Sequence, residues 1–172
     1  MSGDFSLRPI PARIFADDIE SNHEYITMRY AKQDINVLLP TERLRELEQR
    51  EVIGEVGDRH FSIYDFLTSV EGVRGELALR LISELAEDEI DVALLLPVCE
   101  LGHQTMSVLQ VELEKAGVSS LVIGTDRAAM ERVATPRALV AECPNLSMFG
   151  QPGNRNMQET ILNDALDHLK NA

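Results

Sequence analysis

Residues 91–117 have the sequence DVALLLPVCELGHQTMSVLQVELEKAG, and this stretch decides the fold. The apolar run 92–96 has the length of a buried strand and is too short to span a membrane. After a short turn, apolar side chains recur with helical spacing over 103–116, and Gly117 is typical of a helix end. The pattern predicts a strand, a turn and a helix, with Cys99 in the turn.

Cys99 stands where thiol chemistry is favoured. It follows the carboxyl end of a predicted strand and precedes a helix, the place where open α/β sheets build their sites. The unpaired N–H groups and the dipole of a helix N-terminus favour negative charge, so they favour the thiolate. We therefore select Cys99 as a candidate nucleophile, with a small buried turn residue as the alternative.

Strands and helices alternate regularly from residue 91 onward. We expect strands at 92–96, 121–124 and 138–141, and helices at 103–116, about 125–133 and the C-terminal residues. This alternation predicts crossover connections and a doubly wound, mainly parallel α/β sheet.

The first half of the chain has weaker signals. We expect 1–33 to be an irregular segment because of its prolines, with a short strand at 25–30 as one option. Residues 35–39 form either a strand or a buried entry to a helix that begins near Thr41. Residues 53–64, with two glycines, are expected to be a loop with aromatic contacts.

Composition excludes several classes of function. The chain has 172 residues, enough for one domain with a real core, and a net charge of −13, which would repel phosphate backbones and anionic lipids. We therefore expect no nucleic-acid partner and no membrane partner. The two cysteines without a secretion signal fit a reducing, cytoplasmic location.

Several short segments, in this order along the chain, resemble motifs of one known family. They are 34–37 (DINV), 43–47 (RLREL), 59–62 (RHFS), 97–105 (PVCELGHQT), 114–118 (EKAGV), 136–139 (PRAL) and 150–153 (GQPG). Together they resemble the glycine/sarcosine/betaine reductase selenoprotein B family, to which D-proline reductase is related. The resemblance covers about 34–172 and implies a single domain with a Rossmann-like three-layer core.

The resemblance also implies a chemistry. A reactive selenocysteine or cysteine attacks a carbon that bears an amino group, and thiols supply the electrons for reductive C–N cleavage. Cys99 falls at the reactive position, whereas the family's second cysteine position is Gly102 here. A first βα segment is also not apparent, so the resemblance implies that self-association or a partner subunit supplies a sheet edge.

Other residues are candidates for supporting roles. His103 is a candidate proton donor, and Gln104 and Thr105 are candidate hydrogen-bond donors from the first helical turn. His60 and Arg59 are candidate substrate contacts on a loop, with Asn36 as a weaker one. For each of them capping or packing is the structural alternative.

Cys143 follows another predicted strand, so it is a candidate to approach Cys99 and replace the missing second thiol. A metal site is not expected, because Cys-x₃-His alone is a weak pattern. No glycine-rich dinucleotide fingerprint is present, so no nicotinamide or flavin cofactor is expected.

Two hypotheses of function follow. The first is a thiol-dependent oxidoreductase or reductase subunit that acts through Cys99 on a small amine- or amino-acid-like substrate. The second is a catalytically inert family member that serves as a binding or scaffold subunit of a larger complex. Gly102 favours the second hypothesis, and retention of 99–105 favours the first.

Overall fold

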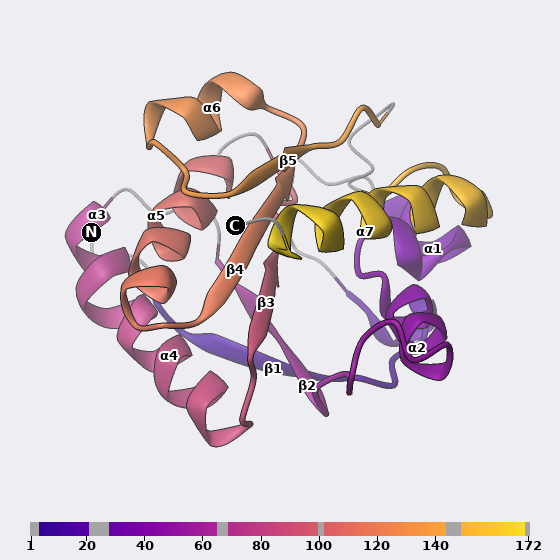
Figure 1. The fold of residues 1–172 in the computed structure, drawn as a ribbon, viewed down its shortest axis with the longest axis horizontal. Coiled ribbons are helices and arrows are strands. Elements are labelled where there is room, and N and C mark those ends of the chain that lie inside the picture. The colour runs from indigo at the N-terminus through magenta and orange to yellow at the C-terminus, as the bar shows by residue number, and fades with distance from the viewer. Residues whose placement is uncertain (1–3, 21–27, 65–68, 100–101, 144–148, 171–172) are drawn as a thin grey trace.

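The computed structural model describes residues 4–20, 28–64, 69–99, 102–143 and 149–170 (Figure 1). Its elements, in chain order, are β1 (Leu7–Pro11), η1 (Ala16–Asp18), α1 (Met28–Gln33), η2 (Ile35–Val37), α2 (Thr41–Gln49), β2 (Arg59–Ile63), α3 (Val70–Gly72), η3 (Val73–Leu77), α4 (Ala78–Glu87), β3 (Val92–Leu95), α5 (Gly102–Lys115), β4 (Ser119–Gly124), α6 (Arg127–Arg132), β5 (Ala138–Val140) and α7 (Arg155–Lys170).

The second half of the chain forms a parallel sheet. Its strand order is β3-β4-β5, with β4 in the centre. Helix α5 connects β3 to β4, and α6 connects β4 to β5. The alternation of strands and helices predicted from residue 91 onward is therefore confirmed. The helices between these strands are the crossover connections that two parallel strands require.

Helices cover both faces of this sheet (Figure 1). Val122 of β4 packs with buried residues of α4 and α5, whereas Leu121 and Ile123 pack with those of α2 and α7. The two-residue alternation of a strand explains this division, since successive side chains point to opposite faces. The mixed α/β class is confirmed, and a Rossmann-like three-layer sandwich stays a prediction.

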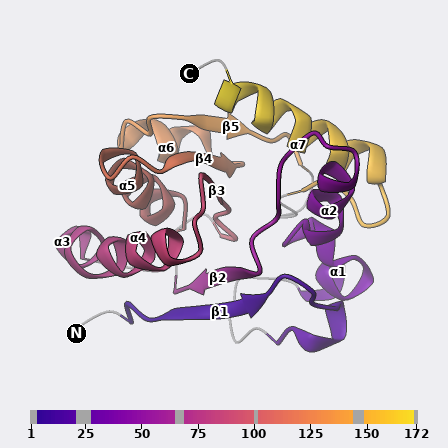
Figure 2. The ribbon, with the colours of Figure 1, turned by 60° about the horizontal axis from the view of Figure 1, so that its bottom comes forward.

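A second, antiparallel sheet contradicts two expectations. Residues 7–11, expected to be irregular, form β1, and the expected loop 53–64 contains β2. The strands pair with Leu7 opposite Ile63 and Pro9 opposite Phe61, and Figure 2 shows them side by side outside the parallel sheet. Prolines are tolerated in β1 because an edge strand does not need every N–H for its ladder.

The segment before α2 is helical. Residues 28–30, part of an expected strand at 25–30, belong to α1, and 25–27 lie outside the described residues. Residues 35–37 form a buried 3-10 turn capped by the Asp34 side chain, so the expected buried entry to a helix is confirmed. No helix in the described part of the chain has the length and apolar character needed to cross a membrane.

Replacing Leu109 by Ala tests the contact between α5 and the sheet. Leu109 is 1% exposed, within the α4–α5 side of the core, so we expect a loss of about 2–5 kcal/mol in the free energy of unfolding. Leu79→Ala on α4 is the matched control, because Leu79 is 62% exposed and its loss should be below about 0.5 kcal/mol. Urea denaturation measures both, and equal losses would contradict this packing.

Candidate functional site

Cys99 lies in the turn between β3 and α5, as the sequence predicts. Its side chain is buried, and its carbonyl oxygen accepts two hydrogen bonds. One comes from the Gly102 amide at 3.1 Å, and the other involves Nδ1 of His103 at 2.9 Å. The main chain at Cys99 is therefore fixed against the first turn of α5. Glu100 and Leu101 lie outside the described residues.

The His103 ring is 1% exposed and lies between two turns. Its Nε2 atom is 2.9 Å from the Thr125 amide nitrogen and 3.1 Å from that of Asp126, both of which donate. Those amides belong to the turn that follows β4. Both ring nitrogens are thus engaged with the main chain, and in this arrangement no ring N–H is left for a substrate.

Gly124 is a site residue that the sequence analysis missed. It is the last residue of β4, and a Cβ atom there would lie 2.6 Å from Cδ2 and 2.8 Å from Nε2 of His103. The ring and the strand backbone can approach this closely only because Gly124 has no side chain. A glycine at the end of a predicted strand was the available signal. Asp126 caps α6, since its carboxylate accepts from the Ala129 amide at 3.0 Å.

The next two candidates on α5 point in different directions. The Gln104 side chain is exposed, whereas Thr105 is buried. Consecutive helical residues are about 100° apart around the axis, so the two cannot contact one small ligand from the same face.

Arg59 and His60 lie on β2. The Arg59 guanidinium donates to both oxygens of Asp88, at 2.8 and 2.9 Å, and pairs with Glu84 at 2.8 Å. These contacts tie β2 to α4, so Arg59 has a clear structural role. Burial, with a smaller effect of the Arg45 charge, lowers the pKa of His60. Its Nε2 atom has no hydrogen-bond partner among the described residues.

Cys143 follows β5 and is half-buried against the α2–α7 side of the core. Burial raises the pKa of its thiol, although the Gly150 amide donates to Sγ at 3.2 Å and opposes that rise. A higher pKa leaves less thiolate at neutral pH. Because β4 separates β3 from β5, the strands that precede the two cysteines are roughly 10 Å apart.

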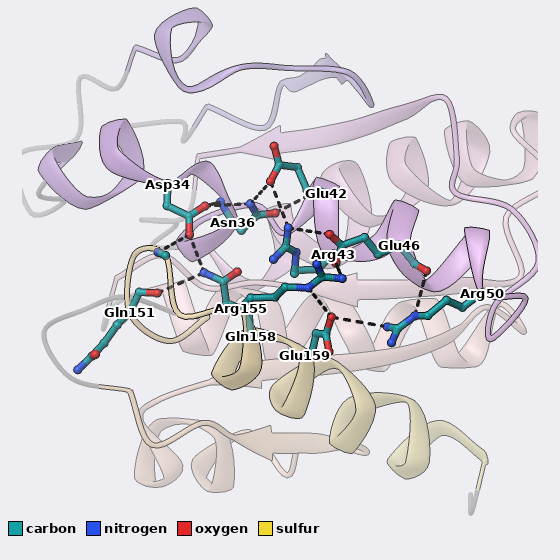
Figure 3. A network of polar contacts seen from close by, with 11 residues as sticks. Asp34, Asn36, Glu42, Arg43, Glu46, Arg50, Gln151, Arg155, Gln158 and Glu159 are labelled. Carbon is teal, nitrogen blue, oxygen red and sulfur yellow. Dashed lines mark hydrogen bonds and ion pairs between the residues drawn. The ribbon is translucent and has the colours of Figure 1, made fainter.

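A polar network joins η2, α2 and the start of α7 (Figure 3). One oxygen of Asp34 accepts from the main-chain and side-chain nitrogens of Asn36, and the other from the Gly153 amide at 2.8 Å and Gln158 at 2.7 Å. Burial of Asp34 favours the neutral acid, but these hydrogen bonds outweigh it and lower its pKa. Asn36 thus has a structural role here.

Ion pairs extend the same network along α2 and α7. Arg155 pairs with Glu46 at 3.1 Å and with Glu159 at 2.8 Å, and Arg43 pairs with Glu46 at 2.9 Å. Three of the segments that carry the family resemblance, 34–37, 43–47 and 150–153, therefore meet in space (Figure 3). Within the described ranges, no group of three or more His, Cys, Asp or Glu side chains could hold a metal ion.

The chain is thus an α/β protein with a thiol at the end of a strand. Comparison with known proteins shows that it is similar to a reductase subunit. The chain is 24% identical to the D-proline reductase subunit gamma of Acetoanaerobium sticklandii over 169 residues, which is 98% of this chain and 70% of that protein. This similarity supports the broader reductase family and not the specific selenoprotein B member. No protein-family model and no solved structure matches the chain.

The Asp34 network predicts a specific loss of stability in acid. The pKa of Asp34 in the folded chain is below its ordinary value of 3.8. The ionised carboxylate therefore stabilises the folded chain above pH 3.8, and this stabilisation is lost as the pH falls through the lowered pKa. Asp34→Asn should therefore lower stability at neutral pH and flatten the acid limb of a stability–pH curve. Asp164→Asn, an exposed position on α7, is the control and should leave that limb unchanged.

Proposed function

We propose that the chain is a subunit of a thiol-dependent reductase in which Cys99 is the nucleophile. The substrate is a small amine or amino acid, as the name of the D-proline reductase relative suggests. The observation that carries the proposal is the placement of Cys99, at the carboxyl end of β3 and just before α5. A cytoplasmic location and a doubly wound, Rossmann-like core are part of the same proposal.

The proposed chemistry has two steps. In the first, the Cys99 thiolate attacks the carbon that bears the amino group, a C–S bond forms, and the amine leaves with the C–N bond electrons and takes up a proton. In the second, another thiolate attacks the Cys99 sulfur, and the carbon leaves with the C–S electrons and is protonated. The substrate gains two electrons, and the two thiols are oxidised to a disulfide.

The second thiol comes from outside this chain in our proposal. Gly102 occupies the family's second cysteine position, and Cys143 has a raised thiol pKa and follows a strand two positions away from β3. A partner subunit or a small dithiol would therefore resolve the adduct. This need supports association with another subunit or with a second copy of the chain.

A scaffold role is the second candidate. It is favoured by the burial of Cys99, whose residue is only 6% exposed, because a nucleophile must reach its substrate. In that case the chain would support a reductase complex without a reacting thiol. The two functions make opposite predictions for the reactivity of Cys99.

Alkylation with iodoacetamide near neutral pH separates the two functions. If Cys99 is the nucleophile, we expect it to react more than about tenfold faster than Cys143, whose thiol pKa is raised. Cys143→Ser should keep the fast phase, and Cys99→Ser should remove it. Equal, slow reaction of both thiols would favour the scaffold.

An activity assay completes this test. With companion reductase subunits and dithiothreitol as the dithiol, Cys99→Ser should abolish reduction of D-proline or a related amino acid, whereas the matched Cys143→Ser variant should keep it. Full activity of the Cys99→Ser protein would overturn the catalytic proposal.

A further inference from the structure

We infer that His103 is a neutral positioning residue that fastens the Cys99 turn to the turn after β4, and that it is not the proton donor of the reaction. The inference rests on the proposed function only where it concerns the reactivity of Cys99. The hydrogen bonds that carry it are properties of the folded chain itself.

The protonation state follows from the partners of the two ring nitrogens. The main-chain amides of Thr125 and Asp126 can only donate, so Nε2 must offer its lone pair to them. The carbonyl oxygen of Cys99 can only accept, so Nδ1 must carry the hydrogen. An imidazolium ring would also carry hydrogen on Nε2, and that N–H would face the N–H groups of Thr125 and Asp126. The geometry therefore fits the neutral ring with hydrogen on Nδ1.

The surroundings of the ring hold it in this orientation. The main chain of His103 is anchored in α5, where its carbonyl accepts from the Ser107 hydroxyl at 2.7 Å. On the other side, Gly124 leaves room for the ring face. The Asp126 cap fixes the turn that supplies the two amides. A ring that is hydrogen-bonded to the Cys99 carbonyl on one side and to the Thr125 and Asp126 amides on the other transmits a displacement of one contact to the other.

This coupling matters for the thiol. The orientation of Cys99 relative to the amides of α5 depends on its own peptide group, and His103 holds the carbonyl of that group. Loosening the ring should therefore change how readily the thiol ionises and reacts. Because both nitrogens of His103 are engaged, the proton for the leaving amine has to come from a group other than this ring.

The tautomer is measured directly by long-range ¹H–¹⁵N correlation spectroscopy of the wild-type chain at neutral pH. We expect His103 to show the pattern of a neutral ring with hydrogen on Nδ1. A ring with hydrogen on Nε2, or on both nitrogens, would overturn the inference. This measurement does not depend on any variant or on enzymatic activity.

Two substitutions separate the two halves of the contact. In His103→Asn the side-chain amide can still donate to the Cys99 carbonyl, but nothing replaces Nε2. In His103→Gln the side-chain oxygen can accept from Thr125 and Asp126, but the donor to Cys99 is lost. Each variant therefore keeps one connection and loses the other.

Hydrogen exchange and alkylation give the readouts. We expect amide exchange of Thr125 and Asp126 to accelerate about tenfold or more in His103→Asn and to stay near wild type in His103→Gln. The rate of Cys99 alkylation should change about tenfold in His103→Gln and by less in His103→Asn. If the two variants change amide exchange and Cys99 alkylation to the same extent, or if neither variant changes them, the proposed coupling is wrong.

A third variant keeps the histidine residue and changes its surroundings. Gly124→Ala adds a methyl group where His103 now lies, so it should displace the ring and reproduce both effects. Circular dichroism verifies that each variant is folded. If a variant does not fold, the inference is tested by the tautomer of His103 in the wild-type chain. If the tautomer and the exchange pattern are as expected but Cys99→Ser keeps full reductase activity, the coupling stands and the proposed catalytic role of Cys99 fails.

Discussion

The parallel pairing of β3 with β4 sets the carboxyl ends of the two strands side by side. The register places Val92 opposite Ser119 and Leu95 opposite Val122, so the turn after each strand emerges at the same edge of the sheet. Thr125 and Asp126, which are 22 and 23 residues from His103 in sequence, thereby come within reach of its imidazole ring. Without this pairing, the His103 ring would not connect the main chain at Cys99 to the turn after β4.

Polar side chains fix α5 to the sheet at both of its ends. Near its C-terminal half, the fully buried Gln110 donates to the carbonyls of Ser120 at 2.9 Å and Arg137 at 2.7 Å. Glu114 accepts from the amide and hydroxyl of Ser120 and pairs with Arg137. With His103 at the other end, the helix has a defined position along its axis, which apolar packing alone does not provide. A defined position of α5 is what gives the Cys99 turn a defined geometry.

The parallel half of the fold was predictable because its signals are local. An apolar run, a turn and a helical period define β3, Cys99 and α5 from neighbouring residues alone. The antiparallel sheet was missed because RHFSI at β2 has weak alternation and its partner β1 contains two prolines, so the pairing depends on residues about fifty positions apart. The role of His103 escaped the sequence for a similar reason: its partners Thr125 and Asp126 become visible only when two strands are aligned.

Under the proposed function, this chain supplies only some of the groups that reductive C–N cleavage needs. It has one thiol after β3, while the thiol of its second cysteine, after β5, has a raised pKa and its buried histidine is engaged by the main chain. The cleavage consumes two electrons, which a single thiol cannot deliver, and it needs a proton for the leaving amine. Under the proposal the second thiol therefore comes from a partner and the proton from a group other than His103, and the need for a partner is consistent with the similarity of this chain to one subunit of a reductase.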